Sequence, residues 1–218
     1  MHAHLMRKAT GHAATLLAAT LTLAVITRPH AAEPLPELVI PVQVHLMQST
    51  THTNLHTTLT EADVQRIFTK VNRIWSAASI RFTVTSTRKT DALDVPADAQ
   101  FTEPFGRVKA ALPPPAVGSN YLTVCYVKSI QPNGFHYGEP TVVKDTAKLT
   151  EVPGGIDEPL PRVTSHELGH ALGLKHRQDT TNLMASGTTG FALNEAEIKL
   201  ARTRAAKFSP AAPGTTKP

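Results

Sequence analysis

The sequence predicts an α+β fold. Short segments rich in β-branched residues predict strands in the N-terminal two-thirds of the chain. One segment near residue 60 has apolar residues at i, i+3, i+4 and i+7, the spacing of an amphipathic helix, and two more helices are expected towards the C-terminus. With 218 residues, of which 41% are apolar and 18% charged, the chain is long enough for one domain with a full core.

The first 32 residues are expected to be a secretory signal peptide. Two basic residues precede an apolar run at 13–26, and small residues follow it. This run is short for a membrane anchor. Removing residues 1–32 deletes Arg7, Lys8 and Arg28 and no acid, so the formal net charge falls from +5 to +2. We therefore expect a secreted or periplasmic protein with no nucleic-acid partner and no membrane contact after signal cleavage.

Two strands are expected to flank one long helix in the first part of the mature chain. A short lead at 33–37 precedes the strand 38–48, in which Pro41 favours an edge position or an irregular start. Residues 60–78 begin with capping-box spacing and continue with helical periodicity. Residues 80–87 alternate between apolar and polar side chains, as in a half-buried strand.

Weaker signals follow along the middle of the chain. A short helix is expected near 105–112, a strand at 121–130, a turn-rich loop in PNGFHYG at 132–138, and a short strand at 141–145. The only cysteine, Cys125, lies within an apolar stretch, so no intrachain disulfide can form and we expect a buried strand residue.

The C-terminal part contains two predicted helices. The Gly- and Pro-rich segment 152–161 is expected to precede a helix that carries the sequence HELGH. Asn194 with Glu197 has the spacing of an N-cap pair and predicts a final helix to about residue 207. A catalytic domain at 38–208 and a disordered tail at 209–218 are expected.

The helix with HELGH can bring two metal ligands together. His166 and His170 are four residues apart, so their side chains share one helical face and lie about 6 Å apart along the axis. Two imidazoles placed in this way can converge on one cation at about 2.0–2.1 Å, as zinc requires. Two ligands are too few for a tight site, so the chain must supply a third.

His176 is the nearest candidate for the third ligand. In a continuing helix it would rise about 9 Å beyond His170 and leave the shared face. Gly173 can end the helix between them, because glycine takes positive φ without steric cost. Three imidazoles around zinc with an open fourth position acidify a bound water molecule, and Glu167 can take its proton. Peptide hydrolysis needs these parts.

Residues 164–187 resemble the extended zinc motif and methionine turn of the metzincin zinc peptidases. The matching residues are His166, Glu167, His170, Gly173, His176 and Met184. The resemblance implies one catalytic Zn²⁺ bound by the three histidines, Glu167 as general base and Met184 as a hydrophobic floor. It also implies a twisted mixed sheet with two long helices in an N-terminal subdomain and a small C-terminal subdomain ending in a helix.

The subgroup stays unassigned. HELGHALGL is most similar to the matrixins and the pappalysin-like bacterial enzymes, but matrixins have Ser after the third histidine, where this chain has Arg177. A cysteine-bearing inhibitory propeptide is not expected, because few residues lie between Ala32 and the first strand and Cys125 lies in a predicted core strand. Another zinc peptidase class takes its third ligand from a glutamate on a later helix, such as Glu195 or Glu197. Its usual Asp four residues further on is missing here.

The expected substrate is a protein or peptide bound in extended form to the edge of the sheet, and a monomer is favoured. The candidate edge strand is 141–145, and the candidate pocket wall is 185–191. The candidate cleft residues are Tyr137, Thr141, Val142, Val143 and Phe191. Candidates for a structural Ca²⁺ are Asp145, Asp157 and Glu158. The alternative functions are an exported zinc protein that binds peptides without efficient turnover, and a surface protein with structural zinc.

Overall fold

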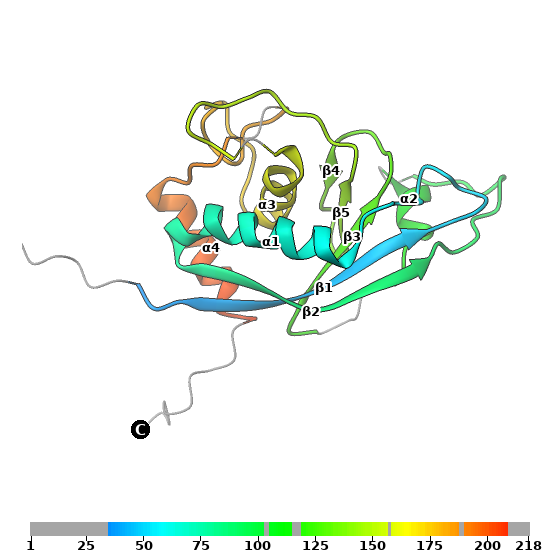
Figure 1. Ribbon diagram of the computed structural model, residues 1–218, viewed down its shortest axis with the longest axis horizontal. Coiled ribbons are helices and arrows are strands. Elements are labelled where there is room, and N and C mark those ends of the chain that lie inside the picture. Colours follow the sequence, from blue (N-terminus) through cyan, green and yellow to red (C-terminus); the bar gives the residue numbers. More distant parts are fainter. Residues whose placement is uncertain (1–34, 103–104, 115–118, 157, 188–189, 209–218) are drawn as a thin grey trace, which may run out of the picture. The chain divides into compact units, whose positions relative to one another are not determined.

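Among the described residues, a five-stranded mixed sheet has the strand order β2-β1-β3-β5-β4 (Figure 1). The strands are β1 (Leu38–Gln48), β2 (Ile80–Asp91), β3 (Leu122–Val127), β4 (Gly134–Phe135) and β5 (Thr141–Lys144). Neighbouring strands among β2, β1, β3 and β5 are parallel, whereas β4 is antiparallel to β5. The predicted α+β class with a mixed sheet is confirmed.

The computed structural model describes residues 35–102, 105–114, 119–156, 158–187 and 190–208. The predicted signal segment and the predicted C-terminal tail lie outside these residues. No helix in the described part of the chain is long and apolar enough to cross a membrane.

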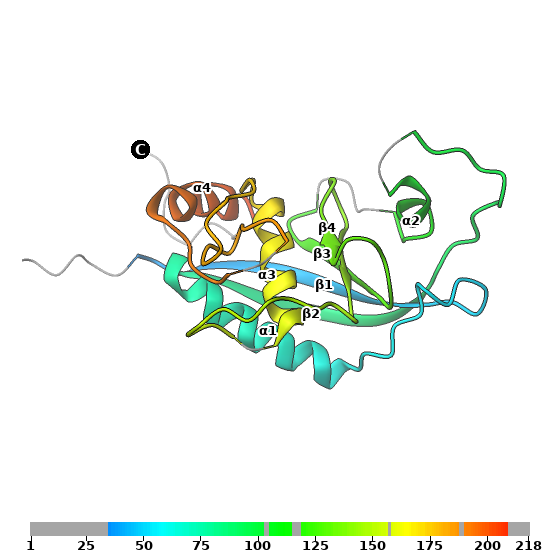
Figure 2. The same cartoon turned by 90° about the horizontal axis from the view of Figure 1, so that it is seen from above.

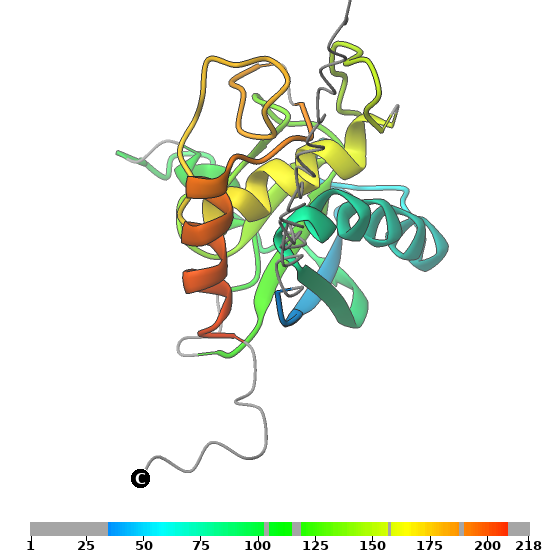
Figure 3. The ribbon, with the colours of Figure 1, turned by 90° about the vertical axis from the view of Figure 1, so that its left-hand side faces the viewer.

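Two long helices cover one face of the sheet (Figures 1 and 2). They are α1 (Glu61–Trp75), which is followed by the 3-10 turn Ser76–Ala78, and α3 (Pro159–Ala171). The short helix α2 (Gly106–Ala110) follows β2 in the chain, and α4 (Glu195–Ala205) is the last helix. Figure 3 shows α1 and α3 side by side, with α4 near the C-terminal end of α3.

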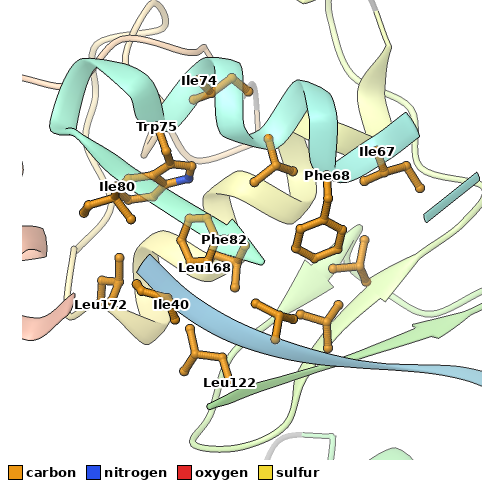
Figure 4. Packing of buried hydrophobic residues seen from close by; sticks show 14 of the residues in the cluster. Ile40, Ile67, Phe68, Ile74, Trp75, Ile80, Phe82, Leu122, Leu168 and Leu172 are labelled. Carbon is orange, nitrogen blue, oxygen red and sulfur yellow. The ribbon is translucent and has the colours of Figure 1, made fainter. Parts of the chain in front are cut away.

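The apolar stripe of α1 explains its position. Thr60 and Asp63 form the predicted capping box, and the apolar residues at helical spacing are buried against the sheet. Trp75, at the end of α1, packs edge-to-face on Phe82 of β2 with ring centroids 5.7 Å apart (Figure 4). Such aromatic pairs contribute about 0.5–1.5 kcal/mol beyond the area they bury. Cys125 of β3 is fully buried in the apolar cluster on the other face, as predicted.

Two strand predictions need correction. β1 lies between β2 and β3, so Pro41 does not mark an edge strand. The ladder to β3 begins only at Val42, and the register with β2 shifts after that residue, which fits the predicted irregular start. β2 continues beyond residue 87, because its pairing with β1 extends to Asp91.

Two further differences lie next to the zinc motif. The segment PNGFHYG contains β4, which was predicted as part of a loop. A two-residue strand has almost no sequence signal of its own and exists here because β5 pairs with it. The helix α3 begins at Pro159, inside the segment predicted to precede it. Proline is tolerated in the first helical turn, because the backbone N–H groups there have no intrahelical partner.

Candidate metal centre

The helix α3 carries His166, Glu167 and His170 on its last two turns. The rings of His166 and His170 face each other edge-to-face with centroids 4.8 Å apart, as expected for residues four apart on one helix. His166 is buried, whereas His170 is half-buried. The helix therefore presents two imidazoles at the border between core and solvent.

Gly173 ends the helix as predicted. Its φ is +84°, and its N–H donates to the carbonyl of His170 at 2.8 Å. The N–H of Leu174 donates to the carbonyl of Gly169 at 2.9 Å, and these two bonds together form a Schellman motif. The chain reverses direction here, which allows His176 to approach the helix.

The three histidines come together. Their candidate ligand nitrogens all lie within 4.8 Å of one another, and the Nε2 atoms of His170 and His176 are 3.1 Å apart. Two nitrogen ligands at about 2.0–2.1 Å from a tetrahedral zinc ion are about 3.4 Å apart. A chelating set of three imidazoles of this size fits zinc.

Backbone carbonyls orient two of the three rings. A carbonyl oxygen can only accept, so Nδ1 of His166 donates to Leu183 at 2.7 Å and Nδ1 of His170 donates to Leu174 at 2.9 Å. Each ring thus keeps its lone pair on Nε2, the atom that can bind a metal ion. Burial lowers the pKa of His166 to about 4, and it also lowers the pKa of His170. Both rings are therefore neutral near pH 7, as metal binding requires.

Glu167 lies beside the histidines and is 5% exposed. Burial raises the pKa of its carboxyl group to about 8. Gly134 of β4 lies directly against this side chain. A Cβ added to Gly134 would lie 2.7 Å from Cγ and 2.9 Å from Oε1 of Glu167. The close approach of β4 to α3 thus depends on glycine at this position.

Met184, the residue for which the resemblance implies a hydrophobic floor, is fully buried and lies against α3. A Cβ added to Gly169 of α3 would lie 2.6 Å from Sδ of Met184. The N–H of Met184 donates to Oδ1 of Asn182 at 2.7 Å, and its carbonyl accepts from the N–H of Arg177 at 2.8 Å. We call Asn182–Ala185 the methionine turn.

A cavity of about 450 Å³ contains the three histidines and Glu167. Aromatic side chains form one wall, where Phe105 stacks on Phe135 with ring centroids 4.4 Å apart and Tyr137 lies against both. The cavity is lined by Phe105, Pro132, Asn133, Gly134, Phe135, His136, Tyr137, Leu149, Val163, His166, Glu167, His170, His176, Ala185, Ser186 and Gly187. Of the predicted cleft residues, Tyr137 is among those that line this cavity.

The other predicted cleft residues do not line this cavity, and the predicted edge position of 141–145 is wrong. Thr141, Val142 and Val143 are fully buried, because β5 lies between β3 and β4 and is not an edge strand. The edge of the sheet on this side is β4. Phe191 does not line the cavity; its ring packs against Gly155, where an added Cβ would lie 2.8 Å from Cδ1. Of the predicted wall 185–191, the described residues that line the cavity are Ala185, Ser186 and Gly187, while 188 and 189 lie outside the described residues.

Sequence reasoning missed Gly134 and Phe105 as parts of the site. The alternation of Phe135 and Tyr137 was the only local signal for β4, and Asn133-Gly134 favoured a turn instead. Phe105 reaches Phe135 from a segment that joins β2 to β3, with φ of +60°. Non-glycine residues rarely adopt this conformation, and the sequence gives no sign of it.

Neither glutamate proposed as an alternative third ligand belongs to the group of residues that could hold a metal ion. Glu197 accepts hydrogen bonds from Arg177 and Asn182, and Glu195 is exposed at the start of α4. Calcium is not supported. Asp145 accepts from Thr57, Glu158 is paired with Lys70 at 2.7 Å and with Arg66, and Asp157 lies outside the described residues.

Comparisons with known proteins give one family model that matches part of the chain and solved structures with a similar fold. The family model described as Matrixin matches residues 136–203, the segment from the cavity wall to α4. Archaemetzincin from Methanopyrus kandleri has a similar structure, with 15% identity, a TM-score of 0.50, and coverage of 77% of this chain and 95% of that one. Mirolysin, solved in complex with a compound, has 14% identity and a TM-score of 0.52, with coverage of 84% and 100%. No curated protein matches the sequence.

Proposed function

We propose that this chain is an exported zinc endopeptidase of the metzincin type. Its metzincin-like fold and the match of residues 136–203 to the Matrixin family model support this proposal. The observation that carries the proposal is the convergence of three imidazoles and one buried carboxyl group in a single open cavity. A closed structural zinc site has four protein ligands, and among the described residues only three gather here.

The proposed ligands are His166, His170 and His176. When bound, zinc supplies a Lewis acid and lowers the pKa of water at its open position to about 7. The chain's own part is to keep the imidazoles neutral and oriented. The carbonyls of Leu183 and Leu174 do this for the first two rings, because each accepts the Nδ1 proton.

Glu167 is the proposed general base. Its carboxyl group lies in the cavity lining beside His166, and burial raises its pKa to about 8. That shift belongs to the metal-free chain; a bound Zn²⁺ would oppose it and favour the carboxylate, which can take a proton from water and then give it to the leaving amine. The backbone of Gly134 packs directly against the Glu167 side chain, so the carboxyl group has little room to move.

The cavity lining favours cleavage within a chain over removal of terminal residues. An exopeptidase needs a charged group that binds the terminal ammonium or carboxylate. Among the described residues, those that line the cavity include no lysine, arginine or aspartate, and their only carboxyl group is that of Glu167. The outer edge of β4 has no neighbouring strand among the described residues and can pair with an extended substrate.

Export is proposed from residues 1–32, whose basic, apolar and small-residue order is that of a signal peptide. Expression of the full chain in a bacterial host should give a shortened protein outside the cytoplasm. The same chain with Arg7 and Lys8 changed to glutamate should be exported less efficiently. Full-length protein retained in the cytoplasm in both cases would contradict export.

Zinc content and peptide hydrolysis test the activity. We expect the chain to bind one zinc ion and to cleave casein and peptides with blocked termini, and we expect Glu167→Ala to keep zinc but lose hydrolysis. Glu195→Ala, which removes an exposed carboxylate from α4, is the control. Equal hydrolysis with and without Glu167 would refute the mechanism. Zinc binding without hydrolysis in the unchanged chain would favour a peptide-binding protein.

A further inference from the structure

Arg177 directly follows the proposed ligand His176, and its side chain binds the first turn of α4. Its Nε donates to Oε1 of Glu197 at 2.8 Å. We infer that the Arg177–Glu197 ion pair positions the proposed ligand His176 and the methionine turn, so that zinc affinity depends on the first turn of α4. The inference rests on the proposed zinc site.

Glu197 is buried more deeply than its helix requires. As the third residue of α4 it forms a capping box with Asn194, and the glutamate of such a box can remain in solvent. Here Glu197 is only 3% exposed. A buried carboxylate is costly unless charged and hydrogen-bonded partners compensate for its lost hydration. Arg177, twenty residues earlier in the sequence, supplies the positive charge that compensates the Glu197 carboxylate.

One branch of this network reaches the first histidine. Oε2 of Glu197 accepts from Nδ2 of Asn182 at 2.8 Å, and Oδ1 of Asn182 accepts from the N–H of Met184. These bonds hold the backbone of the methionine turn. Within that turn, the carbonyl of Leu183 orients the ring of His166.

The other branch reaches the third histidine. The N–H of Arg177 donates to the carbonyl of Met184, and Arg177 and Ala185 form an isolated parallel bridge. The backbone after His176 is thus bound to the methionine turn, while the Arg177 side chain binds α4. Because Gly173 ends α3, no helix holds His176, and these loop contacts must limit its position instead.

The two branches share a single anchor, the carboxylate of Glu197. Its loss would release Asn182 and Arg177 together, and with them the backbone that flanks the methionine turn. Groups that do not bind the metal themselves but hold its ligands in position typically contribute 10–100-fold to metal affinity. The ion pair with Glu197 thus gives Arg177 a structural role at the position where matrixins have Ser.

Competition with a chromophoric zinc chelator measures the effect without relying on catalysis. We expect the zinc dissociation constant to rise about 10–100-fold in Glu197→Ala and about 10-fold in Arg177→Ala. The double variant should be no weaker than Glu197→Ala, because the pair acts as a unit. Arg177→Lys should recover part of the affinity. Glu195→Ala, two residues earlier on the same helix, should bind zinc like the unchanged chain.

The unchanged chain separates the two hypotheses. If it binds no zinc, the proposed function fails. If it binds zinc and folded Arg177→Ala and Glu197→Ala bind equally well, the positioning role is refuted while the proposed function stands. Fluorescence of the single tryptophan, the buried Trp75, reports folding of each variant. Should Glu197→Ala not fold, Arg177→Ala decides the question, because its side chain is 49% exposed and carries little of the core.

Discussion

Replacing Glu167 with glutamine is expected to stabilise the metal-free protein at neutral pH. Burial raises the pKa of Glu167 from 4.5 to about 8 in the folded chain. Between these values the folded state keeps a proton that the unfolded state has released. The unfolded state therefore binds fewer protons, and the stability of the unchanged protein falls as the pH rises from 4.5 to about 8. Glutamine does not titrate and avoids this loss.

The size of the effect follows from the same pKa. From 4.5 to pH 7 is a span of 2.5 pH units, and each unit corresponds to about 1.4 kcal/mol, so the variant should be about 3–4 kcal/mol more stable at pH 7. The difference should vanish near pH 4 and stop growing above about pH 8. Zinc must be removed first, because a nearby cation favours the carboxylate and opposes the shift.

Urea unfolding of chelator-treated protein, followed by Trp75 fluorescence at pH 4, 5.5, 7 and 8, measures this difference. Glu195→Gln is the matched control, because its carboxylate is exposed on α4, and it should show no comparable growth of the difference with pH. A stability difference between Glu167→Gln and the unchanged chain that does not increase with pH would show that burial does not perturb this carboxyl group in solution.

Three further substitutions test the site. Gly134→Ala would place Cβ 2.7 Å from Cγ of Glu167, so kcat should fall about 10²-fold while zinc content stays the same; unchanged kcat would contradict the close packing. Gly173→Ala puts an L-residue at φ of +84°, which costs about 1–2 kcal/mol and should lower Tm by about 2–4 °C per kcal/mol in a thermal melt. An unaltered Tm would show that the turn relaxes without cost. Phe105→Ala removes the ring stacked on Phe135 and should raise KM more for peptides with aromatic side chains than for alanine-rich ones; an equal rise for both would argue against an aromatic contact with substrate.

The parts of the site that could be predicted are those set by local geometry. Helical spacing alone places His166 and His170 on one face, and Gly173 ends the helix as its sequence position predicts. Both capping boxes were also predicted, because their hydrogen bonds join residues only three apart. The gathering of His176 with the other two histidines agrees with the prediction that the chain reverses after Gly173.

The parts that could not be predicted depend on pairing between distant segments. The edge of the sheet was assigned to 141–145, but β4 pairs there, and a two-residue strand has too few side chains for a periodic signal. No local pattern links Arg177 to Glu197 or brings Gly134 against Glu167. The sequence by itself thus determined the spacing of the three proposed zinc ligands and the helix that carries His166 and His170. Only the tertiary structure decided which strand lines the cavity and that Arg177 and Glu197 contact each other beside the three histidines. The physical reason is that these contacts join residues that are far apart in the sequence and meet only in the folded chain.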